Sequence, residues 1–443
     1  MSTEPGVEKV LVTGASGYIA THIVQQLQQA GYKVRGTVRS LTNPKKVGPL
    51  ISKLRQPGNI GQMAIHLLSM SVYLSVCPHA EVLVTGASGY IATHIVQQLQ
   101  QAGYKVRGTV RSLTNPKKVG PLKELCPNAA HELELVEADL TNEACWKDAV
   151  QGCSHVIHTA SPFPDKSPKD ENIVIKPAVE GTTNVLQACV DVGGVKRVVL
   201  TSSVAAISDL TETNTEPITE ETWRNMNSPM EDAYGKSKAL AEKAAWDFVE
   251  KLPAESKFEL AVINPSMVLG PVICGVPGTS VEVIRRILER DPPAIPKLNF
   301  PVCDVRDVAK AHVVAMTHPD APGHRHIVSP HNMWFREMAD VLREEFRDKG
   351  YKPPSMMAPP LLLKMVSWFD STVKYILPLQ GHKTTLSNHR LTEVLGIKPY
   401  EPKESLIDMA YTCIDKGFIV RKKQYVNPKT QQTQTTEGAS ASP

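Results

Sequence analysis

The sequence predicts an α/β fold, namely a Rossmann-type doubly wound parallel sheet with a smaller C-terminal substrate lobe. Three observations lead to this prediction. An apolar strand ends at a Gly-rich turn, a helical pattern begins directly after the turn, and short apolar strands then alternate with helices along the chain. In a parallel sheet of this kind, nucleotides bind at the carboxyl ends of the strands.

The strand and its turn lie in residues 82–92, VLVTGASGYIA. The first three residues form the apolar run. Gly86 and Gly89 follow where the strand must turn sharply and let its backbone approach a pyrophosphate, whose charge then rests on the N-terminus of the next helix. Gly-rich turns are common, so the motif alone is weak evidence, and the elements after it carry the prediction.

Later elements continue the alternation. Apolar runs predict strands at residues 104–110, 131–137, 154–158, 197–201 and 260–264, and helical patterns predict helices at 173–192 and 236–249. Beyond Gly270 the pattern loosens into helices and Pro-rich connections. We therefore expect residues 82–424 to form an NAD(P)-binding Rossmann domain, with its substrate lobe mainly from residue 271 onward.

The first part of the chain contains a duplication. Residues 10–50 recur without a change as residues 82–122, and the insert 51–81 matches neither copy. Two identical copies indicate either a recent exon duplication or a gene-model error in which the insert is translated intervening sequence. We expect residues 1–81 to lie outside the main fold. Residues 425–443 are rich in Gln, Thr, Ser and Gly, which predicts a disordered tail.

Composition excludes several classes of function. The formal charge of +4 is modest, and Lys and Arg are scattered, so nucleic-acid binding has little support. None of the eight Cys residues forms a C-x-x-C pair, which favours a reducing compartment with neither zinc nor disulfides and predicts no metal site. We expect a cytoplasmic monomer or homodimer that acts on a small-molecule carbonyl substrate.

No segment is predicted to cross a membrane. The start, MSTEPGVEK, has Glu4 and Pro5 where a signal peptide needs an apolar core. Residues 63–77 are too short and too polar to span a bilayer. Residues 359–378 are apolar but contain charged residues, so we expect an amphipathic helix packed on a core rather than a membrane contact.

The choice of cofactor depends on the end of the second strand, where NAD enzymes usually carry an acid against the ribose hydroxyls. Residues 103–122 contain no acid, whereas Arg111 and Lys118 offer a guanidinium and an ammonium to a 2'-phosphate. This pattern favours NADP(H) over NAD. The alternative is that these residues form a solvated basic loop.

The chemistry is predicted at Tyr234 and Lys238, in the sequence YGKSK. On a helix this spacing puts both side chains on one face, where the ammonium stabilises a phenolate and lowers the pKa of the phenol. A strand end upstream carries Ser203, whose hydroxyl can hold a substrate carbonyl beside the Tyr. Tyr425 and Lys429 share the spacing, but Pro428 lies between them and the segment adjoins the polar tail, so we interpret it as a decoy.

Several ordered motifs together resemble the extended short-chain dehydrogenases/reductases, over residues 82 to about 417. They are VTGASGYIA, ADL at 138–140, HTASP at 158–162, TSS at 201–203, YGKSK, NPSMVLGP at 264–271 and DVRDVAKAH at 304–312. Within this family the chain is most similar to the dihydroflavonol reductase group, which includes cinnamoyl-CoA, anthocyanidin and methylglyoxal-type carbonyl reductases and shares the basic loop VRGTVRS-x-x-N-x-KK.

The resemblance implies a role for individual residues. Ser203 would orient the substrate carbonyl, Tyr234 would deliver the proton, and Lys238 would bind the nicotinamide ribose and lower the pKa of Tyr234. Ser208 stands where plant flavonoid enzymes usually carry an Asn, which argues against a flavonoid substrate. The implied cofactor residues are Gly86, Ser88, Gly89, Tyr90 and Ile91 at the pyrophosphate, Arg111 and Lys118 at the 2'-phosphate, Asp139 and Leu140 at the adenine, and Thr159, Ala160, Tyr234, Lys238 and Pro265 elsewhere along the cofactor.

The leading hypothesis is NADPH-dependent reduction of an aldehyde or ketone. A second hypothesis, an NAD-linked 3-beta-hydroxysteroid-type dehydrogenase or a sugar-nucleotide epimerase, predicts an acid after the second strand, which is absent. A third is a non-catalytic NADP-binding sensor, a class that often loses the Tyr or the Lys, whereas both are present here. The loops at 208–230 and 271–301, which would select the substrate, carry no interpretable pattern.

Overall fold

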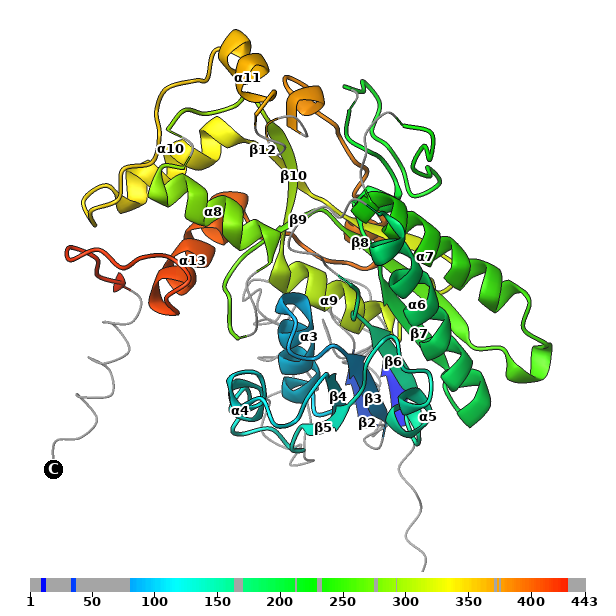
Figure 1. Cartoon of the computed structure of the whole chain (residues 1–443). Coiled ribbons are helices and arrows are strands. Elements are labelled where there is room, and N and C mark those ends of the chain that lie inside the picture. Colours follow the sequence, from blue (N-terminus) through cyan, green and yellow to red (C-terminus); the bar gives the residue numbers. More distant parts are fainter. Residues whose placement is uncertain are drawn as a thin grey trace, which may run out of the picture. The chain divides into compact units, whose positions relative to one another are not determined.

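The computed structural model describes residues 9–12, 33–36, 80–162, 170–211, 213–228, 233–274, 278–291, 293–369, 373 and 376–428 (Figure 1). The chain divides into two compact units, Met1–Cys77 and Pro78–Pro443. The predicted tail beyond residue 428 and most of the predicted duplicate and insert lie outside the described residues. The larger unit contains every predicted site residue.

A seven-stranded parallel sheet forms the centre of the larger unit, in the order β11-β8-β7-β6-β3-β4-β5. The strands are β3 (Glu81–Thr85), β4 (Lys105–Val110), β5 (Glu134–Glu137), β6 (His155–His158), β7 (Arg197–Thr201), β8 (Glu259–Pro265) and β11 (Arg325–Val328). The chain runs outward from β3 to β5 and returns to β6 on the other side of β3. This reversal makes the β3–β6 boundary the topological switch point, where open α/β sheets bind ligands.

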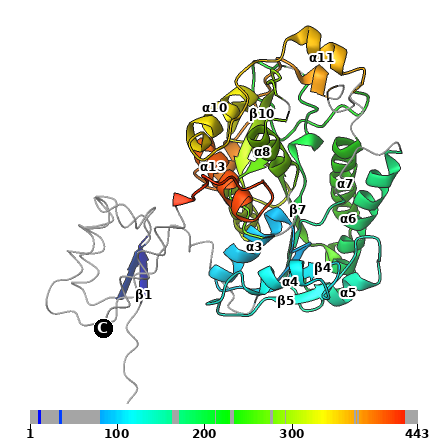
Figure 2. The same ribbon diagram turned by 60° about the vertical axis from the view of Figure 1, so that its left-hand side comes forward.

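Helices cover both faces of this sheet (Figures 1 and 2). One face carries α3 (Tyr90–Gln101) and α9 (Val305–Ala315), and the other carries α5 (Cys145–Val150), α6 (Asn172–Val192) and α7 (Ala233–Glu250). Helix α4 (Pro116–Lys123) follows β4. Apolar side chains of the strands and of α6 and α7, such as Val156, Val185 and Ala245, bury one continuous core. The predicted Rossmann-type fold is therefore confirmed.

The smaller lobe, which the sequence predicts to bind the substrate, has its own sheet and core. Its three strands, in the order β12-β10-β9, are β9 (Met267–Leu269), β10 (Asn299–Asp304) and β12 (His331–Trp334). Its helices are α8 (Thr279–Glu289), α10 (Phe335–Phe346), α11 (Pro360–Val366) and α13 (Pro402–Asp415). Short helical turns occur at η1 (Val204–Ala206), η2 (Ala254–Ser256), η3 (Leu377–Leu379) and η4 (Arg390–Val394). Inside the lobe the ring of Phe346 packs edge-to-face against Tyr351 and at a tilt against Tyr411.

Two sequence predictions about the lobe need correction. The apolar segment at 359–378 packs only in part: among its described residues Leu363 is buried and Ile376 contacts the core of the lobe, whereas Leu361 of the short helix α11 is 71% exposed, Trp368 74% and Phe369 90%. The packed structure also continues past the predicted tail boundary at residue 425. Tyr425 is only 3% exposed, and its hydroxyl donates to the Asp415 carboxylate over 3.0 Å. The error arose because composition alone does not show that a preceding helix offers a partner.

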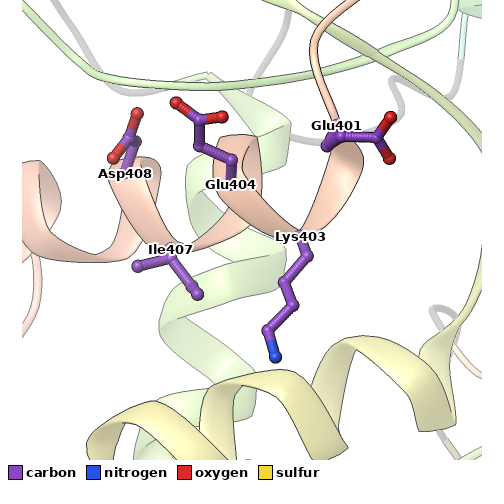
Figure 3. Close-up of a pocket in the computed structure, with 5 residues that line it drawn as sticks. All are labelled: Glu401, Lys403, Glu404, Ile407 and Asp408. Carbon is purple, nitrogen blue, oxygen red and sulfur yellow. The ribbon is translucent and has the colours of Figure 1, made fainter.

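A shallow hollow of about 380 Å³ lies along α13 (Figure 3). Its lining is acidic, with carboxylates on one side of the helix and Lys403 and Ile407 on the other. Lys403 is paired with Glu344 of α10 over 2.9 Å. Since none of the predicted site residues lines this hollow, we do not assign it to the predicted chemistry.

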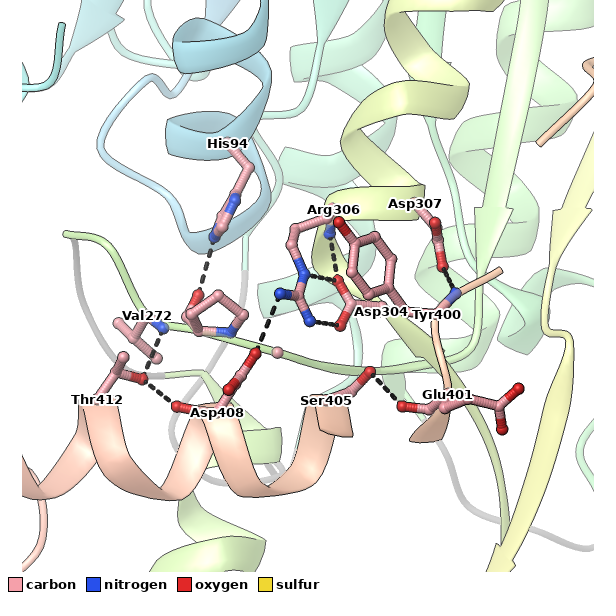
Figure 4. A network of polar contacts seen from close by, with 12 residues as sticks. His94, Val272, Asp304, Arg306, Asp307, Tyr400, Glu401, Ser405, Asp408 and Thr412 are labelled. Carbon is pink, nitrogen blue, oxygen red and sulfur yellow. Dashed lines mark hydrogen bonds and ion pairs between the residues drawn. The ribbon is translucent and has the colours of Figure 1, made fainter. Parts of the chain in front are cut away.

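Arg306, at the start of α9, connects the lobe to the Rossmann helices (Figure 4). Its guanidinium donates to Asp304 over 2.7 Å and to Asp408 of α13 over 3.0 Å, and it stacks 3.8 Å from the centroid of the Tyr400 ring. The neighbouring Asp307 is buried and accepts the Tyr400 N–H over 2.8 Å. This cluster explains why DVRDVAKAH occurs as one motif.

The duplicated strand sequence pairs in the same way in both copies. Strands β1 (Lys9–Val12) and β2 (Lys33–Gly36) pair parallel with Lys9 opposite Lys33, and in the second copy Glu81 lies opposite Lys105. Only the second copy takes part in the seven-stranded sheet. The described residues contain no helix long and apolar enough to cross a membrane.

We expect a chain that begins near residue 80 to keep its fold and its thermal midpoint. The second copy continues directly into β5, whereas use of the first copy would close a loop of about 70 residues at an entropic cost of roughly 4 kcal/mol plus a constant. Circular dichroism melting of the truncated and full-length chains measures this. Loss of folding in the truncated chain would show that the first unit is required.

Asp307→Asn should stabilise the protein at high pH only. Burial raises the pKa of Asp307 from 3.8 to about 6, so the destabilisation of the folded state builds up between about pH 4 and pH 6 and is complete above that range. At about pH 8 the variant should gain up to about 3 kcal/mol, and below about pH 4 the two proteins should be equally stable. Urea unfolding at both pH values checks this. A loss of stability at the higher pH would indicate that the ionised form is favoured in the fold.

Candidate active site

The Gly-rich turn lies against the end of β6 at the switch point. Gly86 has φ of +64°, and a Cβ added there would come within 3.2 Å of the Ala160 backbone. A Cβ at Gly89 would come within 3.2 Å of the Gly86 carbonyl oxygen. The turn is anchored by the Gly86 N–H, which donates to Thr109 Oγ1 over 2.9 Å. The two glycines thus allow a backbone cradle that larger residues would fill.

Thr85, the last residue of β3, holds the end of β6. Its Oγ1 accepts the N–H groups of Thr159 and Ala160, both over 3.0 Å, and contacts His158 Nδ1 over 2.8 Å. With both backbone donors in place, the hydroxyl proton of Thr85 points to the imidazole. The ends of β3 and β6 are therefore joined side by side, and Thr159 and Ala160, two of the predicted cofactor residues, flank the cradle.

The cradle opens onto the N-terminus of α3. Gly89 is its N-cap, no side chain caps it, and its first turn carries no acid. This arrangement suits a pyrophosphate, because unpaired N–H groups and the helix dipole both favour an anion. Ser88 and Ile91 are half-buried here. The side chain of Tyr90 turns away, because its hydroxyl donates to the Gly270 carbonyl over 2.8 Å, so only its backbone remains at the turn.

Predicted residues for the adenosine end surround the ends of β4 and β5. Arg111 is exposed directly after β4, and Lys118 is half-buried in α4. Hydrogen bonds from Thr141 lower the pKa of Asp139, and the charge of Arg111 contributes in the same direction. Leu140 lies directly over Gly181 of α6, where an added Cβ would approach it to 2.9 Å.

One acid at this end was not predicted. Glu137, the last residue of β5, accepts the Leu113 N–H over 2.7 Å and so holds the loop after β4. The prediction examined residues 103–122 only, and an acid from the next strand was missed. The Glu137 carboxylate binds the backbone of the basic loop, and the exposed Arg111 lies at the edge of this loop.

The predicted catalytic pair lies at the start of α7. Tyr234 is half-buried, and Lys238 is only 8% exposed, with its Nζ 5.8 Å from the centroid of the Tyr234 ring. Burial lowers the pKa of Lys238 to about 8, and the charge of Glu242 opposes this shift. The Lys238 charge also contributes to lowering the pKa of His158 to about 3, after burial. Lys238 therefore lies next to the end of β6.

Ser203 follows β7 and caps the short helix η1. Its Oγ accepts the Ala205 N–H over 3.1 Å, which fixes the hydroxyl oxygen. Its own proton has only a long contact of 3.5 Å, to the carbonyl of Pro265 at the end of β8. The hydroxyl is thus oriented by the fold, and its donor capacity is weakly used.

The structure also describes the surroundings of the decoy Tyr425. Burial and the adjacent Asp415 both raise the pKa of Tyr425 far above its ordinary value, so it keeps its proton. Among the described residues, no group of three or more His, Cys, Asp or Glu side chains is arranged to hold a metal ion.

The doubly wound sheet, with a Gly-rich turn at its switch point, defines a dinucleotide-binding fold. The sequence matches the NAD dependent epimerase/dehydratase family over residues 10–56 and 82–329, so that both copies of the duplicated segment are included. The chain belongs to this family. The family resemblance predicted from the motifs is thereby confirmed.

Known relatives are reductases. The chain is 39% identical to cinnamoyl-CoA reductase CAD2 of Medicago truncatula over 59% of this chain and 80% of the relative. It is 35% identical to a dihydroflavonol 4-reductase of Zea mays, over 76% of this chain and 89% of the relative. It is also 39% identical to a putative NADPH-dependent methylglyoxal reductase, GRP2, of Candida albicans, over 74% of this chain and 96% of the relative.

Solved structures agree with these relatives. The complex of Candida albicans Gre2 with NADPH matches 76% of this chain and 99% of its own, with a TM-score of 0.63 and 31% identity. Yeast methylglyoxal/isovaleraldehyde reductase Gre2 with NADPH matches 77% of this chain and 100% of its own, with a TM-score of 0.64 and 32% identity. The predicted class of enzyme, an oxidoreductase, is confirmed by this set of relatives.

Arg111→Ala should weaken NADPH binding about tenfold to a hundredfold and leave NADH binding almost unchanged. The variant removes the charge-assisted contact to the 2'-phosphate that the sequence predicts for Arg111, a contact worth roughly 1.5 to 3 kcal/mol. Fluorescence titration with both cofactors measures it. Lys117→Ala removes an equal charge from the same loop at an exposed position and should have little effect. Equal losses for NADPH and NADH in Arg111→Ala would indicate a structural role.

Proposed function

We propose that this protein reduces an aldehyde or ketone with NADPH, using Tyr234 as the proton donor. The single observation that supports this best is the pairing of half-buried Tyr234 with buried Lys238 on α7, beside the end of β6. NADP(H) is the cofactor, in agreement with the NADPH held by the Gre2 structures and with the basic loop around Arg111.

Bound NADPH would supply the hydride for the carbonyl carbon. The chain's own residues would hold the cofactor in three places: the cradle of Gly86 and Gly89 with the α3 N-terminus at the pyrophosphate, Arg111 with Lys118 at the 2'-phosphate, and Lys238 at the nicotinamide ribose. Thr159 and Ala160 would line the cofactor between these contacts. This assignment uses residues that the sheet brings to one edge.

Tyr234 would transfer its hydroxyl proton to the carbonyl oxygen as negative charge develops there. The Lys238 ammonium, with a pKa of about 8, is mostly charged at neutral pH and stabilises the phenolate that remains. Ser203, whose oxygen is fixed by the Ala205 N–H, would donate its weakly used proton to the same carbonyl oxygen. Hydrogen bonds of this kind raise the rate because they are stronger to the developing alkoxide of the transition state than to the neutral carbonyl.

The two other hypotheses have less support. Sugar-nucleotide epimerisation or hydroxysteroid oxidation with NAD would favour a free acid at the adenosine ribose, whereas Glu137 is engaged with the Leu113 N–H. A non-catalytic sensor would not need a buried ammonium beside a tyrosine. Ser208 accepts the Leu210 N–H over 3.1 Å, so this side chain serves the turn, and a flavonoid substrate is not favoured.

A carbonyl panel tests the proposed function directly. Purified protein would be incubated with NADPH and aldehydes, α-dicarbonyls and aliphatic or aromatic ketones, and NADPH absorbance would be followed. We expect turnover with at least one carbonyl class and much slower turnover with NADH. Absence of turnover across the panel, with NADPH bound, would favour the sensor hypothesis. The cytoplasmic location and the monomeric or homodimeric state remain predictions.

Tyr234→Phe keeps the ring and removes the proton source, so kcat should fall by roughly a hundredfold or more. The affinity for NADPH should hardly change. Lys238→Met should damage both kcat and NADPH binding, because the ammonium is assigned to the ribose and to Tyr234. Steady-state kinetics and cofactor titration separate these effects.

Tyr425→Phe is the matched control for this prediction. It removes a buried hydroxyl that donates to Asp415, so it should lower stability by about 1 kcal/mol. At temperatures well below the thermal midpoint its kcat should equal that of the wild type. Near-normal kcat in Tyr234→Phe would falsify the assignment of the proton donor.

A further inference from the structure

The face of α7 that carries Tyr234 and Lys238 continues to Glu242, one turn further on. Glu242 is completely buried and ion-paired with Arg325 of β11, whose Nε donates to Oε1 over 2.5 Å. The side chain of Arg325 is 6% exposed. Burial of both charges is costly, and replacement of such a pair by apolar residues is often neutral or stabilising. Stability alone therefore does not account for an ion pair at this position.

The Glu242 carboxylate also holds the strand end that carries Ser203. Its Oε2 accepts the hydroxyl of Ser202 over 2.5 Å and the side-chain amide of Asn264 over 3.0 Å. The same Asn264 amide donates to the carbonyl oxygen of Ser203 over 3.2 Å. Helix α7 and the ends of β7 and β8 are thus joined through one carboxylate.

Arg325 extends the connection to the loop that follows Ser203. Its Nη1 donates to the carbonyl oxygens of Glu220 and Thr222, over 3.0 and 2.6 Å, and its guanidinium stacks 4.0 Å from the centroid of the Trp223 ring. Trp223 is 42% exposed and belongs to the segment predicted to select the substrate. The guanidinium therefore neutralises Glu242 and also binds the backbone of this loop.

We propose that Glu242 and Arg325 are a pair of positioning residues, which hold Ser203, Tyr234 and Lys238 in one arrangement and set the electrostatic potential at the Tyr234–Lys238 pair. This inference rests on the proposed function of the same site. Neither residue touches substrate or cofactor in this scheme. They act through the groups that do.

Titratable side chains from two elements surround Lys238. Glu242 and Tyr234 face it from α7, and His158 faces it from β6, where burial keeps the imidazole neutral. Glu242 is faced by Arg325 from β11, by Lys238 and by the indole N–H of Trp246, a neutral donor at 3.3 Å. Removal of Arg325 thus leaves an uncompensated carboxylate one turn from Lys238, and removal of Glu242 leaves an uncompensated guanidinium beside the position of that carboxylate.

The two single variants should move the pH profile in opposite directions. Glu242→Gln leaves the Arg325 cation unpaired, which disfavours the Lys238 ammonium and favours the phenolate of Tyr234. The alkaline limb of kcat/KM, which belongs to this coupled pair, should move to lower pH by on the order of one unit. Arg325→Gln leaves the carboxylate unpaired, which favours the Lys238 ammonium and disfavours the phenolate of Tyr234, and should move the limb to higher pH by a similar amount.

The double variant Glu242→Gln/Arg325→Gln removes both charges and keeps hydrogen-bonding groups. Its alkaline limb should return to within a few tenths of a unit of the wild type, although kcat falls because the strand end is held less firmly. If Glu242→Gln failed to fold, Arg325→Gln and the double variant would still decide. Asp408→Asn breaks the ion pair with Arg306 in the lobe and serves as the matched control, with lower stability and an unmoved limb.

The measurements are pH profiles of kcat/KM with NADPH and one carbonyl, together with thermal midpoints for each full-length variant. Opposite displacements of the limb support the inference. Losses of activity in both single variants with an unmoved limb would overturn it, because a structural role alone lowers activity without this signature.

A readout without turnover separates this inference from the proposed function. Phenolate absorbance of Tyr234, taken as the difference between each protein and its Tyr234→Phe counterpart, gives the same titration directly. If no carbonyl is reduced but the titration moves in opposite directions in the two variants, only the proposed function fails. If turnover occurs and the titration is the same in all variants, only this inference fails.

Discussion

The close approach of two strand ends is the constraint on which the rest of the structure depends. The turn after β3 passes within van der Waals contact of Ala160, which requires Gly86 at positive φ, and Thr85 binds the end of β6 with one hydroxyl. Because this contact lies at the switch point, it places the α3 N-terminus and the chain that follows β6 at the same edge of the sheet. The helices on both faces then bury the strands that hold it.

The burial of charged side chains near α7 is a second constraint on the structure. Lys238, Glu242 and Arg325 are all buried; the ion pair between Glu242 and Arg325 and its hydrogen bonds offset part of the cost, and the burial of Lys238 lowers the pKa of that side chain. The same burial lowers the pKa of Lys238 to about 8, which is close to neutral pH, where the remaining ammonium would stabilise a phenolate. An arrangement that is expensive for folding is therefore the one that makes acid catalysis at α7 chemically reasonable.

Local features were predictable from the sequence, and non-local ones were not. The turn between β3 and α3 and the spacing of Tyr234 and Lys238 depend on neighbours within a few residues, and both elements formed as expected. Glu137 holding the basic loop and Arg325 reaching Glu242 join residues far apart in the chain, and no local periodicity reports such pairs. The same reason explains why Tyr425 was misplaced in the predicted tail.

The duplicated segment separates what a local sequence determines from what its surroundings determine. Identical strand sequences pair in the same register in both copies, so the pairing itself is encoded within the repeat. A two-stranded sheet is at best marginally stable alone, and β3 gains β6 on its other side together with buried contacts from α6 and α7. The nucleotide site proposed above includes that second neighbour, because Thr159 and Ala160 follow the end of β6. The repeat alone thus supplies half of the cradle, and the tertiary fold around the second copy supplies the other half.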